Sequence, residues 1–496
     1  MTYRKLIYTL LLLATTVQAH AADADSILVE HLGAWQSLDG EARNNPALHG
    51  QAFASSFSQL FLKADYQRQS EAFEEEEGDG FFRPAVDIET FLRLSDKTAV
   101  WGSAGYMNGQ QRHVRWNSTT DYKLLKPYIL ADSVGGNVTQ ERYVFSGGYA
   151  TKLEQWLLGA EMLFRAEHEY RDTDPRMRGI VNDLTIRTGA AYTLWDYHWG
   201  LSLEGNIYKQ TNSVVFYREL GVIPEYQMTG LGTEYARFSG DKRSLYFKGR
   251  KVLLLLDAVP TDHQGVYGHL KLGESCYRRV LADLNSMPLT DLYSNLFGAI
   301  LGWKGNRWAT HADFLYTSRN GDEHIGGTAV ATYFPVIGKR TMYKNNLMDA
   351  SLSVLYRQQS IFCLQLKGGY LMNHEHYIYP ERRMEYSRYY GEFSGESFLS
   401  PMKRLTLQCN LNLAYYANAD KRIVMPYGEM QPSFMKKIDR QYEFAKASYG
   451  KVALQVRGDY RLRKSYALFA SVGSGFVHCS AGEHQLTANV SAGVTF

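Results

Sequence analysis

The sequence lacks any long apolar run after its first twenty residues, and this absence excludes a helical membrane protein. A transmembrane helix needs about 20 consecutive apolar residues, whereas the nearest candidate, Val252 to Leu256, is far shorter. The mean hydropathy of −0.34 agrees with this exclusion. Any membrane residence of the mature chain must therefore come from strands or from its surface.

Cysteine, proline and an excess of one charge are also scarce. The 496 residues include 4 Cys and 12 Pro, against 43 Gly and 36 Tyr. So few cysteines in so long a chain exclude a disulfide framework, and this composition is atypical of a disordered chain. The 54 basic and 51 acidic residues leave a net charge of +3. This bias is too weak to indicate a nucleic-acid partner.

The first residues have the pattern of an export signal. Tyr3 to Lys5 is positively charged, Leu6 to Val17 is apolar, and Ala19-His20-Ala21 is a small-residue cleavage site. We expect residues 1–21 to be a signal peptide and the mature chain to begin at Ala22. No Cys stands at the cleavage point to carry acyl chains, so we do not expect a lipoprotein.

The rest of the chain repeats segments of about ten residues with period-two alternation. In Arg404 to Tyr415 apolar residues alternate with polar ones, and Lys451 to Arg461 has a charged polar face. Residues 156–167, 183–192, 201–208, 349–356 and 362–370 follow the same pattern. This periodicity predicts β-strands with one apolar and one polar face.

Two architectures alternate in this way, a soluble β-sandwich and a transmembrane β-barrel. Strands of a sandwich usually have about 5 to 6 residues, whereas a transmembrane strand needs about 9 to 11. Tryptophans such as Trp156, Trp199 and Trp308 fall at predicted strand ends, as in the aromatic girdles of barrels. The alternating C-terminus, Leu486 to Phe496, ends on Phe and resembles the signal that the barrel assembly machinery of Gram-negative bacteria reads. We therefore predict an all-β, antiparallel outer-membrane barrel.

Loop lengths predict the strand number, because such barrels have short periplasmic turns and longer outer loops. The predicted short turns are Ser95 to Lys97, Lys152 to Gln155, Leu194 to His198, Pro260 to Gln264, Lys304 to Asn306, Arg357 to Ser360, Ala417 to Asp420 and Arg463 to Ser465. With both termini periplasmic they imply about 18 strands, or 16 or 14 if the Pro260 turn, the region 421–447 or both are misassigned. The predicted long outer loops are residues 108–141, 211–242, 319–346 and 373–402.

The predicted barrel spans residues 55–496, after a short periplasmic or lumenal segment, 22–54. A TonB-dependent transporter carries a whole plug domain there, so this chain departs from that family. Asn45-Pro46-Ala47 resembles the N-terminal signature of fatty-acid-transporter-like barrels and of a type 9 secretion barrel, which implies a segment inside the lumen. The same residues also fit a plain Asn-Pro turn before a strand.

Over its whole length the sequence resembles an uncharacterised outer-membrane β-barrel family, domain of unknown function 6850. The similar stretches are Asn45 to Leu48, Val252 to Gly273, Leu284 to Leu289 and the final strand. This resemblance implies the fold and the outer membrane as the compartment. It implies neither a substrate nor functional residues.

The familiar linear motifs of hydrolases, zinc proteases and nucleotide-binding proteins are absent, so we predict no enzyme and no cofactor. A catalytic site at the barrel rim would carry no such motif and stays open as an alternative. His374 and His376 share one face of a strand and are weak metal candidates. A solvated loop tip explains them as well. The acidic run Glu74 to Glu77 fits either a calcium site or a solvated loop.

Transport would depend on the inward face of the barrel. The predicted lumen-facing residues are Glu161, Arg165, Arg187, Glu204, Asp349, Lys367, Arg404, Lys451, Arg457, Asp459 and Arg461. Arg404, Arg457 and Arg461 form either a basic ladder that selects solutes or structural pairs across strands. Cys363 is predicted to face the lumen and Cys409 the lipid, on adjacent strands, so no bridge joins them.

The sequence thus predicts passage or binding of a small solute at the outer membrane, with lipid and the assembly machinery as partners. Two other functions remain open. The barrel could bind a surface lipoprotein or receptor through its outer loops, or it could be the scaffold barrel of a secretion system. A continuous polar lumen would favour a channel, and a blocked lumen with apolar loop tips would favour partner binding.

Overall fold

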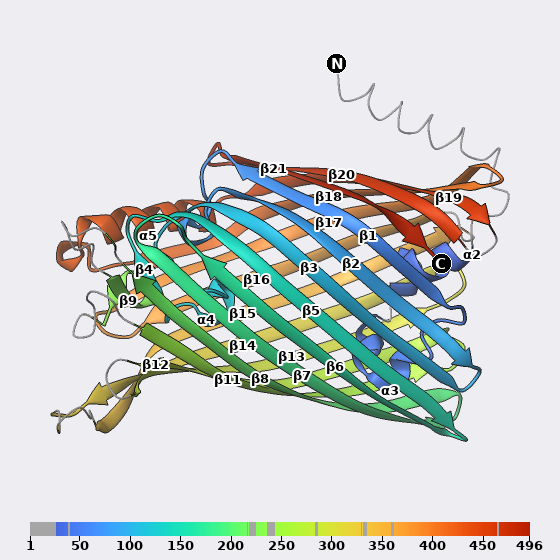
Figure 1. Ribbon diagram of the computed structural model, residues 1–496, viewed down its shortest axis with the longest axis horizontal. Helices are drawn as coiled ribbons and strands as arrows, with labels where there is room; N and C mark the ends of the chain where they lie inside the picture. The colour runs from blue at the N-terminus through green and yellow to red at the C-terminus, as the bar shows by residue number, and fades with distance from the viewer. Residues whose placement is uncertain are drawn as a thin grey trace, which may run out of the picture.

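The structure is a closed antiparallel barrel of 18 strands (Figure 1). It is a computed structural model that describes residues 26–37, 40–215, 217, 225–235, 244–282, 286–328, 330, 335–358, 362–463 and 466–496. The expected signal peptide, residues 1–21, lies outside the described residues. Among the described residues, no helix has the length and apolar character needed to cross a membrane.

Each strand pairs with its sequence neighbour in the barrel. The barrel strands are β1 (Phe57–Gln69), β2 (Gly80–Ser95), β3 (Thr98–Val114), β5 (Gly136–Leu153), β6 (Trp156–Tyr170), β7 (Arg176–Leu194), β8 (Tyr197–Val215), β11 (Ser244–Pro260), β12 (Gly265–Leu281), β13 (Met287–Lys304), β14 (Trp308–Gly326), β15 (Val336–Gln358), β16 (Phe362–Tyr377), β17 (Arg382–Met402), β18 (Leu405–Val424), β19 (Tyr449–Arg463), β20 (Tyr466–Cys479) and β21 (His484–Thr495).

The remaining elements lie at the two ends of the barrel (Figure 1). Near the N-terminus are α2 (Ser26–Leu32), η2 (Ala34–Ser37), η3 (Gly40–Asn44) and α3 (Pro46–His49). At the opposite end are η4 (Glu75–Glu77), α4 (Tyr122–Leu125), β4 (Leu130–Asp132), β9 (Glu225–Gly230), β10 (Thr233–Glu234), η6 (Tyr427–Glu429) and α5 (Pro432–Ala445). Strands β4, β9 and β10 form a small separate sheet.

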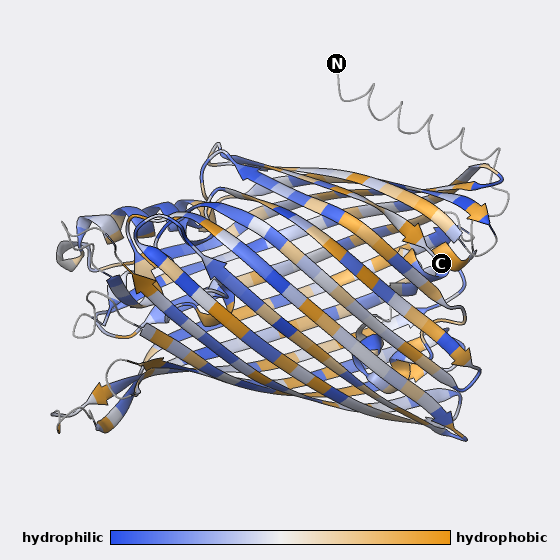
Figure 2. Cartoon of the chain, in the orientation of Figure 1, coloured by the Kyte–Doolittle hydropathy of each residue, from blue (hydrophilic) through white to orange (hydrophobic). Residues whose placement is uncertain are grey.

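Period-two alternation explains why these segments form a barrel wall with two different faces. On β8, Leu201, Leu203 and Ile207 are exposed on the outside, whereas Ser202 and Glu204 between them are buried. Figure 2 shows this alternation of hydrophobic and hydrophilic residues along the strands. In a membrane the outer face contacts hydrocarbon, so the exposed leucines belong there.

The last strand closes the barrel. β21 pairs with β20 on one side and with β1 on the other, where Leu60 lies opposite Val494 and Gln59 opposite Thr495. Val490 and Phe496 are exposed on the outer face. Because β1 and β21 pair, every barrel strand has two neighbours and no edge is left open.

Seven of the eight predicted short turns fall between barrel strands, and two of these seven lie partly outside the described residues. The turn predicted at Ala417 to Asp420 is wrong, because β18 continues through it. Asn418 lies opposite Arg388 and Asp420 opposite Ser387, which leaves Ala419 as the extra residue of a β-bulge. The turn in this region instead joins Met402 to Leu405.

The outer connections are shorter than predicted because the strands are longer. Barrel strands have 12 to 23 residues, which is more than the membrane requires. The segment 373–402, predicted as a long loop, contains the end of β16, a tight turn and the whole of β17. The connections predicted around residues 108–141 and 319–346 exist, but strands occupy both ends of each one, and β8 occupies the start of the one predicted at 211–242.

Candidate functional site

The inward wall carries a chain of alternating charges on β6, β7, β8 and β11. Arg187 lies between two acids, 3.0 Å from Glu161 and 2.6 Å from Glu204. Lys251 lies 2.8 Å from the other oxygen of Glu204. Three of the predicted lumen-facing residues therefore form cross-strand ion pairs, which fix the wall and neutralise its charge.

Arg165, also predicted to face the lumen, binds a segment that folds into the barrel. Its guanidinium lies 2.7 Å from Asp121 in the β3–β5 connection, 3.0 Å from Asp183 and 2.7 Å from Glu167. Four charged groups thus converge where this connection meets the wall. Arg165 is an anchor for the inserted connection rather than a free cation of a pore.

For Arg404, Arg457 and Arg461 the sequence left a basic ladder and structural pairs open, and the structure shows one pair among the described residues, on a single strand. Arg457 makes two hydrogen bonds of 2.9 Å to Asp459 on its own strand. Arg404 belongs to the turn between β17 and β18, because the strand before it already ends at Met402. Lys451 and Arg461 share the face of Arg457 and are exposed.

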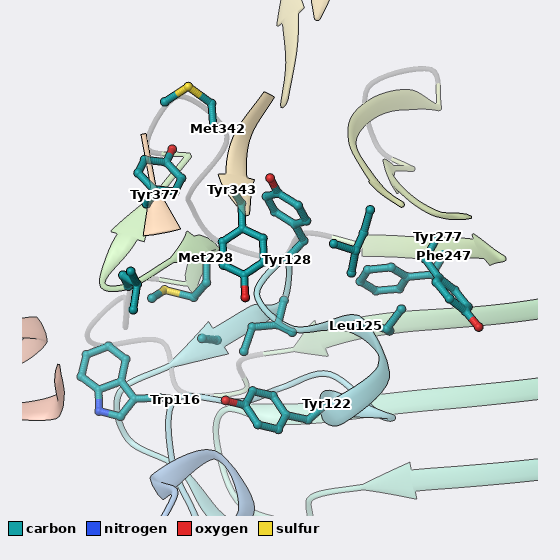
Figure 3. Close-up of a cluster of buried hydrophobic side chains, with 14 of the residues drawn as sticks. Trp116, Tyr122, Leu125, Tyr128, Met228, Phe247, Tyr277, Met342, Tyr343 and Tyr377 are labelled. Carbon is teal, nitrogen blue, oxygen red and sulfur yellow. The ribbon is translucent and has the colours of Figure 1, made fainter. Parts of the chain in front are cut away.

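The outer end of the lumen is closed by chain that folds inward. Trp116, Tyr122 and Tyr128 from the β3–β5 connection pack with Met228 of β9 and Phe434 of α5 (Figure 3). Inward residues of the wall, such as Tyr343 and Tyr377, complete this buried cluster. We call these three inserted parts, residues 115–135, 225–235 and 425–448, the outer closure.

Two buried arginines hold the outer closure to the wall. Arg279 of β12 donates hydrogen bonds to the carbonyl oxygens of Ile129 and Met228, at 3.3 and 3.0 Å, and so joins two inserted parts. Arg171 lies 2.9 Å from Asp132, and both side chains are completely buried. A buried pair of this kind is costly to break because one charge would remain uncompensated.

The acidic run at Glu74 to Glu77 also holds the outer closure. Glu76 lies 2.5 Å from Lys437 of α5, and Glu77 lies 2.9 Å from Lys123 of α4. Burial alone lowers the pKa of Lys126, but the carboxylates around it, first Glu74, outweigh burial and raise the pKa. The acidic run thus connects two inserted parts through ion pairs. The sequence had indicated either a calcium site or a solvated loop, and neither includes this role.

The inner end of the lumen is occupied by the N-terminal segment. Asn45 caps α3 by accepting a hydrogen bond from the Ala47 amide, and its side-chain nitrogen donates to Asp257 of β11 at 3.0 Å. Gly159 and Gly189 of the wall lie so close to Pro46 and Asn45 that a Cβ atom would collide with them. The wall is therefore shaped to receive this segment, residues 26–54, which we call the inner closure.

His49 makes the inner closure sensitive to pH. Burial, with its ring 4.5 Å from that of Trp101, lowers the pKa of His49 from 6.5 to about 4. The docked segment therefore favours neutral His49, and docking weakens as pH falls from about 6.5 towards 4. We expect amide hydrogen exchange of residues 47–50, corrected for its intrinsic rate, to increase between pH 7 and pH 5. His49→Gln should remove this increase, and an equal increase in the variant would contradict the assignment.

Beside the inner closure lies a cavity of about 480 Å³, which we call the chamber. Its polar lining includes Asp257, His269, His311, Asp313, Asp349 and Lys367, and its apolar lining includes Leu255, Ile300 and Leu355. Ala34 and Gly40 of the inner closure also line it. The chamber therefore has the size and mixed lining of a small-molecule site.

Several polar groups of the chamber keep capacity for a ligand. His269 Nδ1 lies 2.8 Å from Asp257, but its Nε2 has no hydrogen-bond partner among the described residues. Lys367 makes no ion pair with the described part of the chain, and its ammonium lies 5.9 Å from the Tyr390 ring. Tyr390 in turn donates to Asp349 at 2.7 Å. A cation and a carboxylate thus flank one aromatic ring.

A second cavity, of about 500 Å³, lies beside the outer closure. Glu74, Lys126, Arg319, Glu375 and Arg388 line it. Arg388 donates to the Phe444 carbonyl oxygen at 3.1 Å, and Arg319 to that of Leu124 at 2.7 Å. Both arginines are therefore used in part to hold α5 and α4.

The weak metal candidates His374 and His376 alternate with inward-facing Glu375 and so face outward. They lie opposite Glu385 and Arg383 of β17. Among the described residues, no group of three or more His, Cys, Asp or Glu side chains is arranged to hold a metal ion. In this motif it is Glu375, not either histidine, that reaches the lumen.

The cysteines are free, and their positions correct one prediction. Cys363 is buried against Trp35 of the inner closure, whereas Cys409 alternates with inward-facing Gln408. β17 lies between their strands, so β16 and β18 are not adjacent as predicted. The error follows from the missed strand β17.

The sequence interpretation included a lumenal N-terminal segment as one alternative, but it missed the outer closure and several residues of the chamber. Asp257 and His269 were not among the predicted lumen-facing residues, although both lie on the inward-facing positions of their strands. The aromatic residues of the connection 115–135, Trp116, Tyr122 and Tyr128, could have indicated that this connection is buried. Such residues are unusual in a purely solvated loop because their burial is strongly favourable.

The family of this chain is now clear. The model of a family of unknown function, DUF6850, matches residues 46–496, and the chain belongs to this family. A search of curated proteins finds no match.

Two solved structures are similar to this chain at low identity. The ferric preacinetobactin receptor BauA of Acinetobacter baumannii is 8% identical with a TM-score of 0.44, over 89% of this chain and 79% of that one. The ferric yersiniabactin uptake receptor FyuA of Yersinia pestis is 8% identical with a TM-score of 0.44, over 89% and 80%.

Proposed function

We propose that this chain is an outer-membrane barrel that binds a small polar solute in its lumen and passes it only when a closure opens. The chamber beside the inner closure carries this proposal. Its volume of about 480 Å³ suits a small solute, and Lys367, Asp349 and His269 provide groups of both charges and a free ring nitrogen. An open diffusion pore has no need of such a site.

Inserted chain at both ends supports a gated route over a permanently open one. The outer closure contains a large buried apolar cluster, and the inner closure fits glycines of the wall. We expect purified wild-type barrel in a planar bilayer to conduct little. A variant without residues 26–54 should conduct markedly more, because the inner end is then open.

The chamber itself is tested by thermal unfolding with three probe classes: dipeptides, maltose and citrate. We expect one class to raise the melting temperature of wild type and not of Asp349→Asn/Lys367→Gln. A matched control, Lys451→Gln/Asp65→Asn, also removes one cation and one carboxylate, but from lumenal residues outside the chamber, and should keep the response. Steady conductance of wild type equal to that of the truncated variant, or no response to any probe, would count against the proposal.

The outer membrane as destination, after cleavage of residues 1–21, is part of the same proposal, with the C-terminal strand as assembly signal. Removing residues 494–496 deletes outward Phe496 and the end of the β1–β21 seam. We expect most of the truncated chain to be lost from the outer-membrane fraction. Phe496→Tyr, which keeps an aromatic end, should be recovered nearly as well as wild type. Full recovery of the truncated chain would refute this role.

A second candidate function, binding of a surface partner, is favoured by the β14–β15 hairpin. β15 is the longest strand of the barrel, with 23 residues, and Ile325, Val330 and Ile337 near this connection are 47%, 67% and 70% exposed. An exposed apolar tip is typical of a contact site. Ile337→Ser should abolish capture of such a partner while leaving solute binding unchanged.

A further inference from the structure

Three cations lie side by side on the outer face of the barrel. Lys248 of β11 is directly opposite Lys209 of β8 on one side and Arg278 of β12 on the other. Like charges directly opposite each other destabilise a sheet. Their sequence separation hides this arrangement, which only the strand register reveals. We call Lys209, Lys248 and Arg278, with nearby Arg250, the cationic row.

The cationic row points away from the lumen and is poorly compensated. All four side chains are exposed, whereas Tyr208 and Phe247, next in sequence to two of them, are buried in the lumen. Lys209, Lys248 and Arg250 make no ion pair with any part of the chain that the structure describes.

The acids near the row do not remove this deficit. Arg278 lies 2.6 Å from Asp291, but that carboxylate also binds His324 at 3.0 Å and Lys339 at 2.6 Å. Glu274 faces outward opposite Val252, one step towards the membrane centre and nearest to Arg250. The two lysines are left without an acid.

The height of the row on the barrel places it at the outer edge of the apolar band. Trp199, exposed near the short-turn end of β8, precedes Lys209 by ten residues, which is about the length of a transmembrane strand. Outward residues between them include Leu201, Leu203 and Ile207, all exposed and apolar. Lys209 therefore lies where the hydrocarbon ends and lipid headgroups begin.

We propose that the cationic row binds the phosphate of a phosphorylated glycolipid headgroup in the outer leaflet. A phosphate presents several acceptor oxygens and a charge that lysine and arginine bind well. It would relieve the repulsion between Lys209 and Lys248 from the lipid side, and the lysine stems would lie along the apolar band. The inference uses the outer-membrane placement of the proposed function but not its solute route.

The test measures lipid retention on the purified barrel in zwitterionic detergent. Barrels are mixed with bis-phosphorylated lipid A or with the same lipid after phosphatase treatment, repurified, and their bound acyl chains are quantified by mass spectrometry. We expect wild type to retain the phosphorylated form. Lys209→Gln/Lys248→Gln should bind it about thirtyfold more weakly, since each basic residue near an anionic surface contributes about fivefold. Lys451→Gln/Arg461→Gln removes the same charge from the lumen face and should bind as wild type.

Several results would overturn the proposal. Equal retention of both lipid A forms would show that phosphate is not recognised, and equal retention by the two double variants would show that the row is not the site. Displacement of lipid A by millimolar inorganic phosphate would make the row a site for free phosphate instead of a headgroup. Loss of the solute response in the thermal experiment, with phosphate-dependent retention intact, would remove the proposed solute function only.

Discussion

Leu411→Arg should lower the free energy of unfolding of the barrel in a bilayer by about 2–4 kcal/mol. Leu411 lies on β18 directly opposite Leu454, which is exposed on the outer face. An arginine near the middle of the lipid-facing band must leave water or distort the bilayer, and both are unfavourable. The measurement is equilibrium unfolding by denaturant in phospholipid vesicles, followed by tryptophan fluorescence.

The neighbouring substitution Asn410→Arg is the matched control. Asn410 lines a lumenal cavity of about 370 Å³ beside the inner closure, so the new side chain has room and access to water. We expect its free energy of unfolding to change by less than about 1 kcal/mol. Equal losses in the two variants would mean that the two faces of β18 have been assigned wrongly.

The fold was predictable because period-two alternation directly reflects contact with lipid on one side and water on the other. The alternation in 404–415 and 485–496 identified strands and their faces correctly. It failed at Asn418 to Asp420, where residues typical of turns are accommodated by a bulge. Because this one turn was misplaced, the residues of β17 were predicted to be a loop. The predicted strand number of 18 was still correct.

The contacts that hold the two closures were not predictable in the same way, because they join distant segments of the chain. Nothing near Glu76 indicates that Lys437 of α5 will lie 2.5 Å away. Likewise, the sequence around Asn45 does not show that its side chain will donate a hydrogen bond to Asp257 of β11. Local patterns report on the environment of a strand, whereas pairing across more than two hundred residues requires the closed barrel.

The charged residues predicted for the lumen show the same limit. The alternation along the strands put Glu161, Arg187 and Glu204 on the inward face, and they lie there in the structure. The alternation does not say which of these charges form ion pairs. Among the described residues, the cations that make no ion pair include Lys367 in the chamber and Lys209 and Lys248 on the outside. The unpaired charges, not the paired ones, are therefore the informative candidates for ligands.

Arg279→Ala should open the outer closure while the barrel stays folded. Arg279 is 1% exposed and bridges the inserted parts through the carbonyl oxygens of Ile129 and Met228. Alanine removes two charge-assisted hydrogen bonds, a loss of about 3 kcal/mol in the docking of the closure, although the Ile129 carbonyl oxygen keeps the hydrogen bond that the Met228 amide donates. The barrel retains its strand pairs because the Arg279 side chain takes no part in them.

Two measurements separate the closure from the barrel in this variant. We expect amide exchange of residues 117–132 and 225–230 to become fast in Arg279→Ala, whereas the heat-modifiable gel mobility of the folded barrel is retained. Arg279→Lys keeps the charge but not the fork of donors that reaches both carbonyls, so its exchange should be intermediate. Lys451→Ala, which removes an exposed lumenal cation, should leave exchange unchanged. Protection of both segments at the wild-type level in Arg279→Ala would mean that apolar packing around Trp116 and Tyr128 alone holds the closure in place.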